Sequence, residues 1–461
     1  MLRFFKVNDP FRLVGLAIYL LILTSIYLVW NPLPITSPQL IWMLLGERLG
    51  QGFFLYQDII DDTGPLSAGF FTLIDLLFGR SQLAYELIGR VIILFQIIYW
   101  NSTLIRYKVF DENTYLPAII MAALFHFSFD MLSLNPAMLG STFLILALGQ
   151  LFSQTVLQKE TSESTLLIGI YGGLAAGFHP SYILFLPYLI FTAIVISGFS
   201  FRQLMLSLVG YTLPILLISV FYYWNDGLQE AIDIWPLILL TAKSTYQSYW
   251  SWLIIAAFPI LLSLIGYFLS AVLKGSTINQ QKQRQLIILW LLFASAEFLF
   301  IKKQAGFQLI IFVPGFTYLI TQFFLHIRRG IIPKLGFYLL ILGLPAFAWW
   351  YWQNNVDNPE YFVSDQIDPA FQNKNIMILG PNISDYQNSI LGGPFLNYQL
   401  SKTYLDQERD LPEKARLYQM LQNQQPEIIL DQEGQFQSIL NDFPELSRHY
   451  KLQKKGVFIL N

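Results

Sequence analysis

The chain has 461 residues, of which 54% are hydrophobic and 16% are aromatic, whereas only 13% are charged. About a quarter of the residues in an ordinary soluble protein are charged, so this composition excludes most soluble classes as well as intrinsic disorder. The chain has no cysteine, which excludes disulfides, thiolate metal sites and Cys nucleophiles, and its net charge of −2 gives no reason to expect a nucleic-acid partner. An integral membrane protein with a smaller soluble part is the class that remains.

Apolar runs that are long enough to cross a bilayer begin near the N-terminus, with Phe11 to Trp30. Basic residues precede this run and no small-residue cleavage site follows it, so we predict a retained first helix with the N-terminus inside. Pro180 breaks an apolar stretch into two further spans. The remaining pattern predicts spans at 83–105, 115–132, 137–156, 165–179, 180–197, 203–223, 251–273, 285–301, 305–326 and 333–352.

The segment from Pro65 to Gly79 is apolar but shorter than a span, and it contains Asp75. Its length favours an amphipathic or re-entrant helix. If this segment does not cross the membrane, most Lys and Arg of the membrane part fall on the cytoplasmic side, as the positive-inside rule requires. We therefore predict about 11 transmembrane helices in the bacterial inner (cytoplasmic) membrane. The N-terminus is then inside, the C-terminus outside, and a long first outer loop covers 31–82.

After Trp352 the sequence changes to a mixed polar composition that continues to the end. Apolar runs at 375–380 and 427–431 predict buried strands, helical spacing predicts helices at 412–424 and 436–443, and alternation at 450–460 predicts a terminal hairpin. We therefore predict a transmembrane domain over 1–353 and a small extracytoplasmic, periplasmic α/β domain over 354–461. No nucleotide-binding glycine motif is present in this tail.

A motif of about 45 residues lies in and after the first outer loop. GQGFFLYQDIIDDTGP, then an apolar helix ending in Phe-Gly, then an arginine early in the next span, resembles the first outer loop of the GT-C glycosyltransferase superfamily. Weaker similarity occurs at GLAAGFHPSYILFLP (173–187) and KKQAGFQLIIFVPG (302–315). The residues that carry the main resemblance are Gly52, Tyr56, Asp58, Gly64, Pro65, Phe78, Gly79 and Arg90.

The resemblance implies a GT-C-like fold and transfer of a sugar from a polyprenyl-phosphate donor at the outer membrane face. The family usually places an acid early in this loop, whereas 31–46 contains neither Asp nor Glu. Two functions therefore stay open: a glycosyltransferase that uses a later acid, and a catalytically silent relative that acts as a binding or assembly subunit of a cell-envelope complex. A transporter ranks behind both, because most charges lie at helix ends and not at mid-membrane depth.

Four acids of the loop are the candidate catalytic residues: Glu47, Asp58, Asp61 and Asp62. Transfer to a hydroxyl needs a base, and a divalent cation needs oxygen ligands, so these carboxylates suit either role. The expected cofactor is accordingly none or a divalent cation of unknown identity. Asp58 and Asp61 would share a face if the segment were helical. The structural alternative is a solvated turn in which Asp62 or Thr63 caps the helix that starts near Pro65.

Basic residues near the outer face are the candidate substrate-binding residues. Lys302 and Lys303 depart from the positive-inside trend, and two ammonium groups suit a lipid phosphate or diphosphate. The alternative for them is ordinary snorkelling toward lipid headgroups. The lesser candidates are Arg48, Arg90 and His179. The expected partners are membrane lipid, a polyprenyl-phosphate-linked sugar and envelope proteins, with no nucleic acid.

Overall fold

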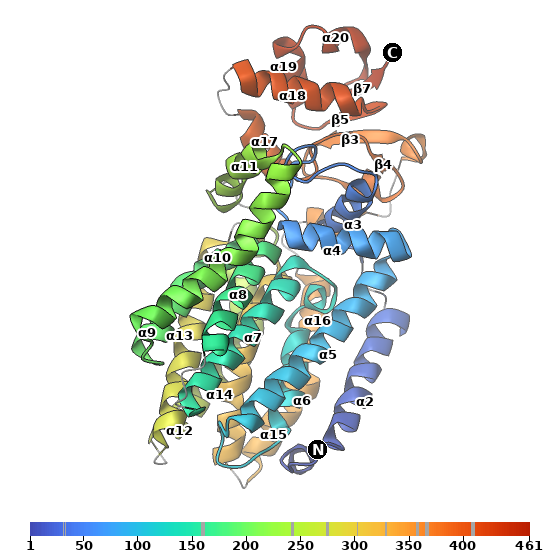
Figure 1. Ribbon diagram of the computed structural model, residues 1–461. Coiled ribbons are helices and arrows are strands. Elements are labelled where there is room, and N and C mark those ends of the chain that lie inside the picture. Colours follow the sequence, from blue (N-terminus) through green and yellow to red (C-terminus); the bar gives the residue numbers. More distant parts are fainter. Residues whose placement is uncertain are drawn as a thin grey trace. The chain divides into compact units, whose positions relative to one another are not determined.

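The computed structural model describes the whole chain apart from residues 31, 33, 158–161, 241–243, 273–275, 302, 328–329, 356–358, 365–367 and 407–410. Figure 1 shows a mainly helical chain with a small sheet near its C-terminus. The chain divides into two compact units. The first comprises Met1–Leu33, Tyr85–Ile218 and Gln247–Asp357, and the second comprises Pro34–Ala84, Ser219–Tyr246 and Asn358–Asn461.

Among the described residues, eight helices are long and apolar enough to cross a membrane. They match eight of the predicted spans, at Arg12–Trp30, Gln82–Arg106, Pro136–Val156, Phe201–Trp224, Tyr249–Ala271, Ile278–Phe300, Gly306–His326 and Ile332–Asn354. The predicted count of about 11 is not confirmed, because the other three segments form shorter helices. These are α6 (Leu116–Leu124), α8 (Ser162–Phe178) and α9 (Leu186–Val195).

Tight turns explain why two of these helices are short. Phe125–Phe127 and Phe129–Leu132 form 3₁₀ turns directly after α6. Pro180–Phe185 forms another before α9, at the break that the sequence predicts, since proline cannot continue a helix. The other elements that lie wholly or mostly in the first unit are α1 (Leu2–Phe5), α2 (Arg12–Ser25), α5 (Gln82–Arg106), α7 (Pro136–Leu157), α10 (Phe201–Trp224), α12 (Tyr249–Val272), α13 (Ile278–Phe300), α14 (Val313–His326), α15 (Ile332–Tyr338), α16 (Leu344–Asn354) and β2 (Lys303–Gln304). The short strand β1 (Ser244–Thr245) belongs to the second unit.

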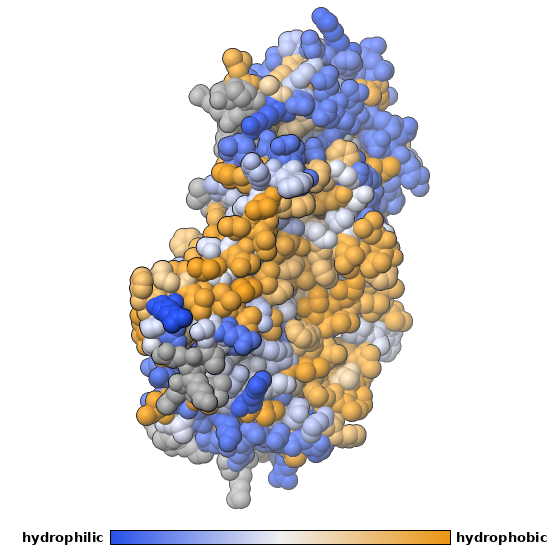
Figure 2. All heavy atoms as spheres, viewed as in Figure 1, coloured by the Kyte–Doolittle hydropathy of each residue, from blue (hydrophilic) through white to orange (hydrophobic). Residues whose placement is uncertain are grey.

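Small residues let helices of the first unit approach each other closely. A Cβ added at Gly169 or Gly173 of α8 would lie 1.9 Å from the Ser207 carbonyl oxygen or 2.2 Å from that of Tyr211, both on α10. These glycines are four residues apart, the small-xxx-small spacing typical of helix pairs in membranes. On the outside of the unit, α5 exposes Val91, Phe95 and Ile98 along one face, and Figure 2 shows extended hydrophobic surface over its helices. This surface is what a lipid-facing helix bundle requires.

The second unit begins with a pair of packed helices, α3 (Ser37–Gly50) and α4 (Pro65–Phe78). Thr36 caps α3 by accepting a hydrogen bond from the Gln39 N–H at 3.3 Å. The two backbones meet at Gly46, where a Cβ would lie 2.6 Å from the Phe71 carbonyl oxygen. With 14 residues, α4 is shorter than a span, in agreement with the prediction for 65–79. Its N-cap residue is Gly64, which has no side chain, and not Asp62 or Thr63.

The tail of the second unit is a small α/β domain, as the sequence predicts. Its five-stranded sheet has the order β4-β3-β5-β7-β6, in which β3 lies parallel to β4 and β5 and the last two strands are antiparallel. The strands are β3 (Asn375–Leu379), β4 (Ile390–Leu391), β5 (Ile428–Asp431), β6 (Tyr450–Lys454) and β7 (Val457–Leu460). The helices are α17 (Tyr398–Asp406), α18 (Leu411–Gln424), α19 (Gln435–Asp442) and α20 (Leu446–His449).

The loop 34–84 and the tail share backbone hydrogen bonds within the second unit. The Ile60 N–H donates to the Pro394 carbonyl oxygen at 2.7 Å, and the Val363 N–H donates to the Ile35 carbonyl oxygen at 3.0 Å. Arg80 adds three side-chain bonds, to the carbonyl oxygens of Tyr386, Gln387 and Ser389. The loop 34–84 is therefore packed on the C-terminal domain, which fixes the position of the loop's acids relative to the tail.

Candidate functional site

A turn at 54–59 presents the predicted motif residues Tyr56 and Asp58. Tyr56 has a positive φ of 71°, which is uncommon for a non-glycine residue, and its N–H donates to the Ile59 carbonyl oxygen at 2.8 Å. The Tyr56 hydroxyl donates to the Thr63 carbonyl oxygen at 2.7 Å. Burial raises the pKa of this hydroxyl well above its ordinary value, with smaller contributions from nearby charges that include Asp61 and Asp62. The phenol stays neutral and holds the turn in place.

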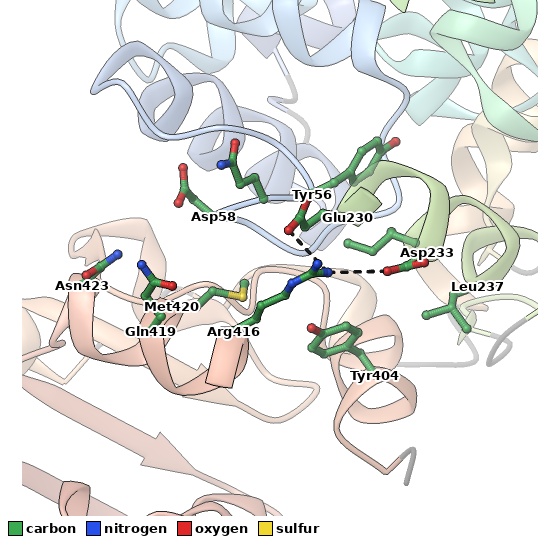
Figure 3. Close-up of a pocket in the computed structure, with 12 residues that line it drawn as sticks. Tyr56, Asp58, Glu230, Asp233, Leu237, Tyr404, Arg416, Gln419, Met420 and Asn423 are labelled. Atoms are coloured by element: carbon green, nitrogen blue, oxygen red, sulfur yellow. Dashed lines mark ion pairs between the residues drawn. The ribbon is translucent and has the colours of Figure 1, made fainter. Parts of the chain in front are cut away.

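The turn forms one wall of a pocket of about 210 Å³ that lies within the second unit (Figure 3). A second wall comes from α11 (Leu228–Leu240), and the third from α17 and α18. Tyr404 is the contribution of α17. The lining residues are Tyr56, Gln57, Asp58, Glu230, Asp233, Ile234, Leu237, Tyr404, Arg416, Gln419, Met420 and Asn423.

Charged residues from α11 and α18 meet at one end of the pocket (Figure 3). Arg416 Nη1 lies 3.5 Å from Glu230 Oε1 and 3.9 Å from Asp233 Oδ2. Glu230 and Asp233 are one helical turn apart and so face the same way. With Asp58, the pocket has three carboxylates against one guanidinium, and this surplus of negative charge disfavours anionic ligands.

Asp58 is the loop acid that lines this pocket. Its Oδ2 accepts a hydrogen bond from the Phe54 N–H at 2.8 Å, and its backbone carbonyl oxygen accepts one from Gln424 Nε2 at 2.7 Å. No described residue donates a hydrogen bond to Oδ1. The carboxylate is thus oriented by one oxygen and keeps an acceptor for a hydroxyl or a donor group of a ligand.

The other three candidate acids lie elsewhere in the second unit. Asp61 is fully buried and its Oδ2 accepts from the Thr63 N–H at 2.9 Å, which is a local turn bond. Asp62 is half-buried and does not line the pocket. Glu47 forms an ion pair with Arg80 through Oε2. Because 58–61 is not helical, Asp58 and Asp61 do not share a helix face.

The five basic candidates fall into both units. In the second unit, Arg48 is 8% exposed, donates to Gln51 and Gln424, and stacks on the Phe53 ring at 3.7 Å. In the first unit, Arg90 pairs with Glu86 one turn earlier on α5. The ring of His179 packs edge-on against Tyr182 at 4.7 Å, Lys303 lies in β2, and Lys302 lies outside the described residues.

The sequence reasoning missed the other side of the pocket, namely Glu230, Asp233, Arg416 and the two amides of α18. The acid pair has a helical spacing that could have been noticed, directly after the aromatic end of α10. No sequence pattern links that pair to a tail helix about 180 residues later in the chain, because such contacts are set by tertiary packing. In the described part of the chain, no group of three or more His, Asp or Glu is arranged to hold a metal ion.

No family profile and no curated protein matches this sequence. Among solved structures, the chain is similar to the crystal structure of ArnT from Cupriavidus metallidurans bound to undecaprenyl phosphate, with 11% identity and a TM-score of 0.45. The match covers 73% of this chain and 63% of that chain, so less than two thirds of that protein's length is matched.

Proposed function

We propose that this protein is a GT-C-like membrane glycosyltransferase that moves a sugar from a polyprenyl-phosphate donor to an acceptor hydroxyl at the outer face of the cytoplasmic membrane. The observation that carries the proposal is the placement of Asp58. It is the acid of the family-like Tyr-x-Asp segment, it lines a pocket, and one of its oxygens has no partner among the described residues. The eight membrane-capable helices supply the setting that a lipid-linked donor needs.

Asp58 acts as the general base in this proposal. The acceptor hydroxyl gives its proton to the Asp58 carboxylate while the hydroxyl oxygen bonds to the anomeric carbon of the donor sugar. The bond between that carbon and the phosphate oxygen breaks, and polyprenyl phosphate leaves with the electron pair. The Phe54 N–H stabilises the carboxylate and orients it without blocking Oδ1.

In this proposal the donor phosphate binds to basic residues, namely Lys302, Lys303, Arg90 and His179. Ammonium and guanidinium groups offset the charge of a phosphate and donate hydrogen bonds to its oxygens. The pocket itself is a poor phosphate site because of its excess of carboxylates. Arg48 keeps its hydrogen bonds to Gln51 and Gln424 in this proposal.

Reconstituted protein tests the proposal directly. Purified wild type in liposomes is supplied with polyprenyl-phosphate-linked sugars and a hydroxyl acceptor, and both the released polyprenyl phosphate and the new glycoside are measured. We expect both products in equal amounts. A Lys303→Gln variant should raise the KM for the donor more than it lowers kcat, because a lost phosphate contact acts mainly on affinity.

A second function is favoured by the loop itself. Residues 31–46 contain no Asp or Glu, and Glu47 and Asp61 are committed to Arg80 and Thr63. A silent relative that binds a lipid-linked sugar or an envelope protein as an assembly subunit would have this pattern. Lipid-linked donor that binds to the wild type without any release of polyprenyl phosphate would select this second function.

A further inference from the structure

We propose that the pocket between the 56–58 turn, α11 and α18 binds one hydroxyl-rich sugar unit that carries no acidic group. Its binding is a property of the second unit alone. We take this sugar to be the acceptor of the transfer, because Asp58 is both the proposed base and a residue of the pocket. This second step rests on the proposed function.

Unused hydrogen-bonding groups converge in this pocket. The side-chain amides of Gln57, Gln419 and Asn423 make no hydrogen bond to any described residue, although all three line the pocket. Among described residues, the Arg416 guanidinium makes only the two long ion-pair contacts to α11 and donates no hydrogen bond. Planar amide, carboxylate and guanidinium groups can each contact two neighbouring hydroxyls of a sugar, so this donor and acceptor set matches a polyol.

The pocket residues of α18 lie on one face of that helix. Residues 416, 419, 420 and 423 follow helical spacing, so their side chains point the same way, and all four line the pocket. In Figure 3 the side chains of Gln419 and Asn423 lie toward the end of the pocket where Asp58 stands. Tyr404 adds an aromatic side chain, whose face suits the apolar C–H side of a sugar ring.

Size and charge restrict the ligand class further. The volume of about 210 Å³ lies below the roughly 300–1,000 Å³ of pockets for drug-sized ligands, which indicates one sugar unit. Three carboxylates against one guanidinium repel a phosphate or a uronic acid but accept a neutral or amino-substituted sugar. The negative charge of the pocket therefore makes it unsuitable for the phosphate of the donor.

The test measures binding by the full-length protein in lipid nanodiscs, with saturation-transfer NMR on a panel of probes. The panel contains neutral methyl hexosides of several configurations, glucosamine, glucuronate, inorganic phosphate and spermidine. We expect signals from at least one neutral hexoside or from glucosamine, and none from glucuronate or phosphate. Binding of phosphate or glucuronate at equal strength, binding of spermidine alone, or no binding by any sugar would each overturn the proposal.

Matched variants on α18 locate the binding. Asn423→Leu and Gln419→Leu should each weaken sugar binding about 3- to 10-fold, the usual effect of losing one or two hydrogen bonds. Gln422→Leu is the control, since Gln422 is exposed on the same helix and does not line the pocket. Equal binding by Asn423→Leu, Gln419→Leu and Gln422→Leu would contradict the assignment.

The same variants separate this proposal from the proposed function. Sugar binding without any transfer from the lipid-linked donor would refute the transferase and leave the sugar pocket in place. If the protein transfers sugar and Asn423→Leu does not change the KM for the acceptor, the assignment of the sugar to this pocket is refuted and the transferase function stands. If both proposals hold, Asn423→Leu raises the acceptor KM several-fold and leaves the donor KM unchanged.

Discussion

Asp431 organises the start of α19 through a single carboxylate at the end of β5. Its Oδ1 accepts from the N–H groups of Gly434 and Gln435, and its Oδ2 accepts from that of Phe436, all at 2.8–2.9 Å. We expect Asp431→Ala to destabilise the tail by about 1–3 kcal/mol, because three backbone donors, of which that of Phe436 is buried, lose a charged acceptor. Hydrogen exchange of the α19 and β5 amides in the full-length protein measures this.

Asp442 at the other end of α19 provides the control for that measurement. It is exposed and lies 3.9 Å from Lys414, a surface ion pair that typically contributes little. Asp442→Ala should change the free energy of unfolding, as derived from the exchange rates, by less than about 0.5 kcal/mol. If Asp431→Ala and Asp442→Ala had the same small effect, the capping role of Asp431 would be wrong.

The ion pair between Glu427 and Lys374 links the entrances of β5 and β3. Their charged atoms are 2.9 Å apart, and the hydrogen bond from Lys374 lowers the pKa of Glu427 below its ordinary value of 4.5. A lowered carboxyl pKa means that this stability is present above pH 4.5 and is lost as the pH falls through the folded-state pKa. The pair is largely exposed, so its contribution is about 0.2–1 kcal/mol.

We therefore expect Glu427→Gln to lower the stability of the tail at pH 7 and to reduce its loss of stability on acidification. Exchange of the β3 and β5 amides, measured at pH 7 and at acidic pH, reports both effects. Added salt of 1 M shortens the Debye length to about 3 Å and should reduce the difference in stability between wild type and Glu427→Gln. An identical acid response in wild type and variant would show that Glu427 does not carry this dependence.

At the residue scale, the sequence offers four candidate acids in the first loop, and only the resemblance to a Tyr-x-Asp segment favours Asp58 among them. Glu47, Asp58, Asp61 and Asp62 all lie within 16 residues of each other, and composition alone suits each to catalysis. Their roles are separated by partners far away in sequence, such as Arg80 for Glu47 and Gln424 for the Asp58 backbone. Such partners are set by tertiary packing, which a single sequence does not reveal.

The contact between α3 and α4 depends on the absence of a side chain at Gly46. A Cβ there would lie 2.6 Å from the Phe71 carbonyl oxygen, so the helices would have to move apart. We expect Gly46→Ala to destabilise this helix pair by about 1–3 kcal/mol. Hydrogen exchange of the α3 and α4 amides in the full-length protein detects the change.

Gly69 on α4 is the matched control, because a Cβ at that position meets nothing within 4 Å. Gly69→Ala should leave the helix pair intact or stabilise it by up to about 1 kcal/mol, since alanine has the higher helix propensity. If Gly69→Ala changed the exchange rates as strongly as Gly46→Ala, the close backbone contact at Gly46 could not be the cause of the destabilisation.

At the element scale, the sequence predicts the tail well and the membrane spans in part. Strands at 375–380 and 427–431, helices at 412–424 and 436–443 and the terminal hairpin are all found within one or two residues. The short β4 and the helix α17 are missed because neither has a long periodic pattern. Among the spans, 115–132 is interrupted by 3₁₀ turns that hydropathy alone does not distinguish from helix.

At the scale of the whole molecule, the charge distribution predicts which ends lie outside. The N-terminus and the 274–285 loop should be cytoplasmic, and 354–461 should lie on the outer side. Because the chain has no cysteine, single cysteines can be introduced without background. Gln437→Cys in the tail and Gln281→Cys in the first turn of α13 are both at exposed positions.

Labelling of intact spheroplasts with a membrane-impermeant maleimide should modify Gln437→Cys and spare Gln281→Cys. Permeabilisation of the inner membrane should then expose Gln281→Cys, which makes each variant the control for the other. Labelling in the opposite order would invert the topology and with it the proposed outer-face reaction.

The Asp58 carboxylate is the proposed general base, so its replacement is a direct test of the proposed sugar transfer. Asp58→Asn keeps an oxygen that can accept from the Phe54 N–H, so the turn should survive while the base is lost. We predict that kcat for sugar transfer from a polyprenyl-phosphate donor falls about 10²–10⁴-fold. The exposed Asp442→Asn variant should keep wild-type activity. A folded Asp58→Asn protein that transfers sugar at the wild-type rate would contradict the account.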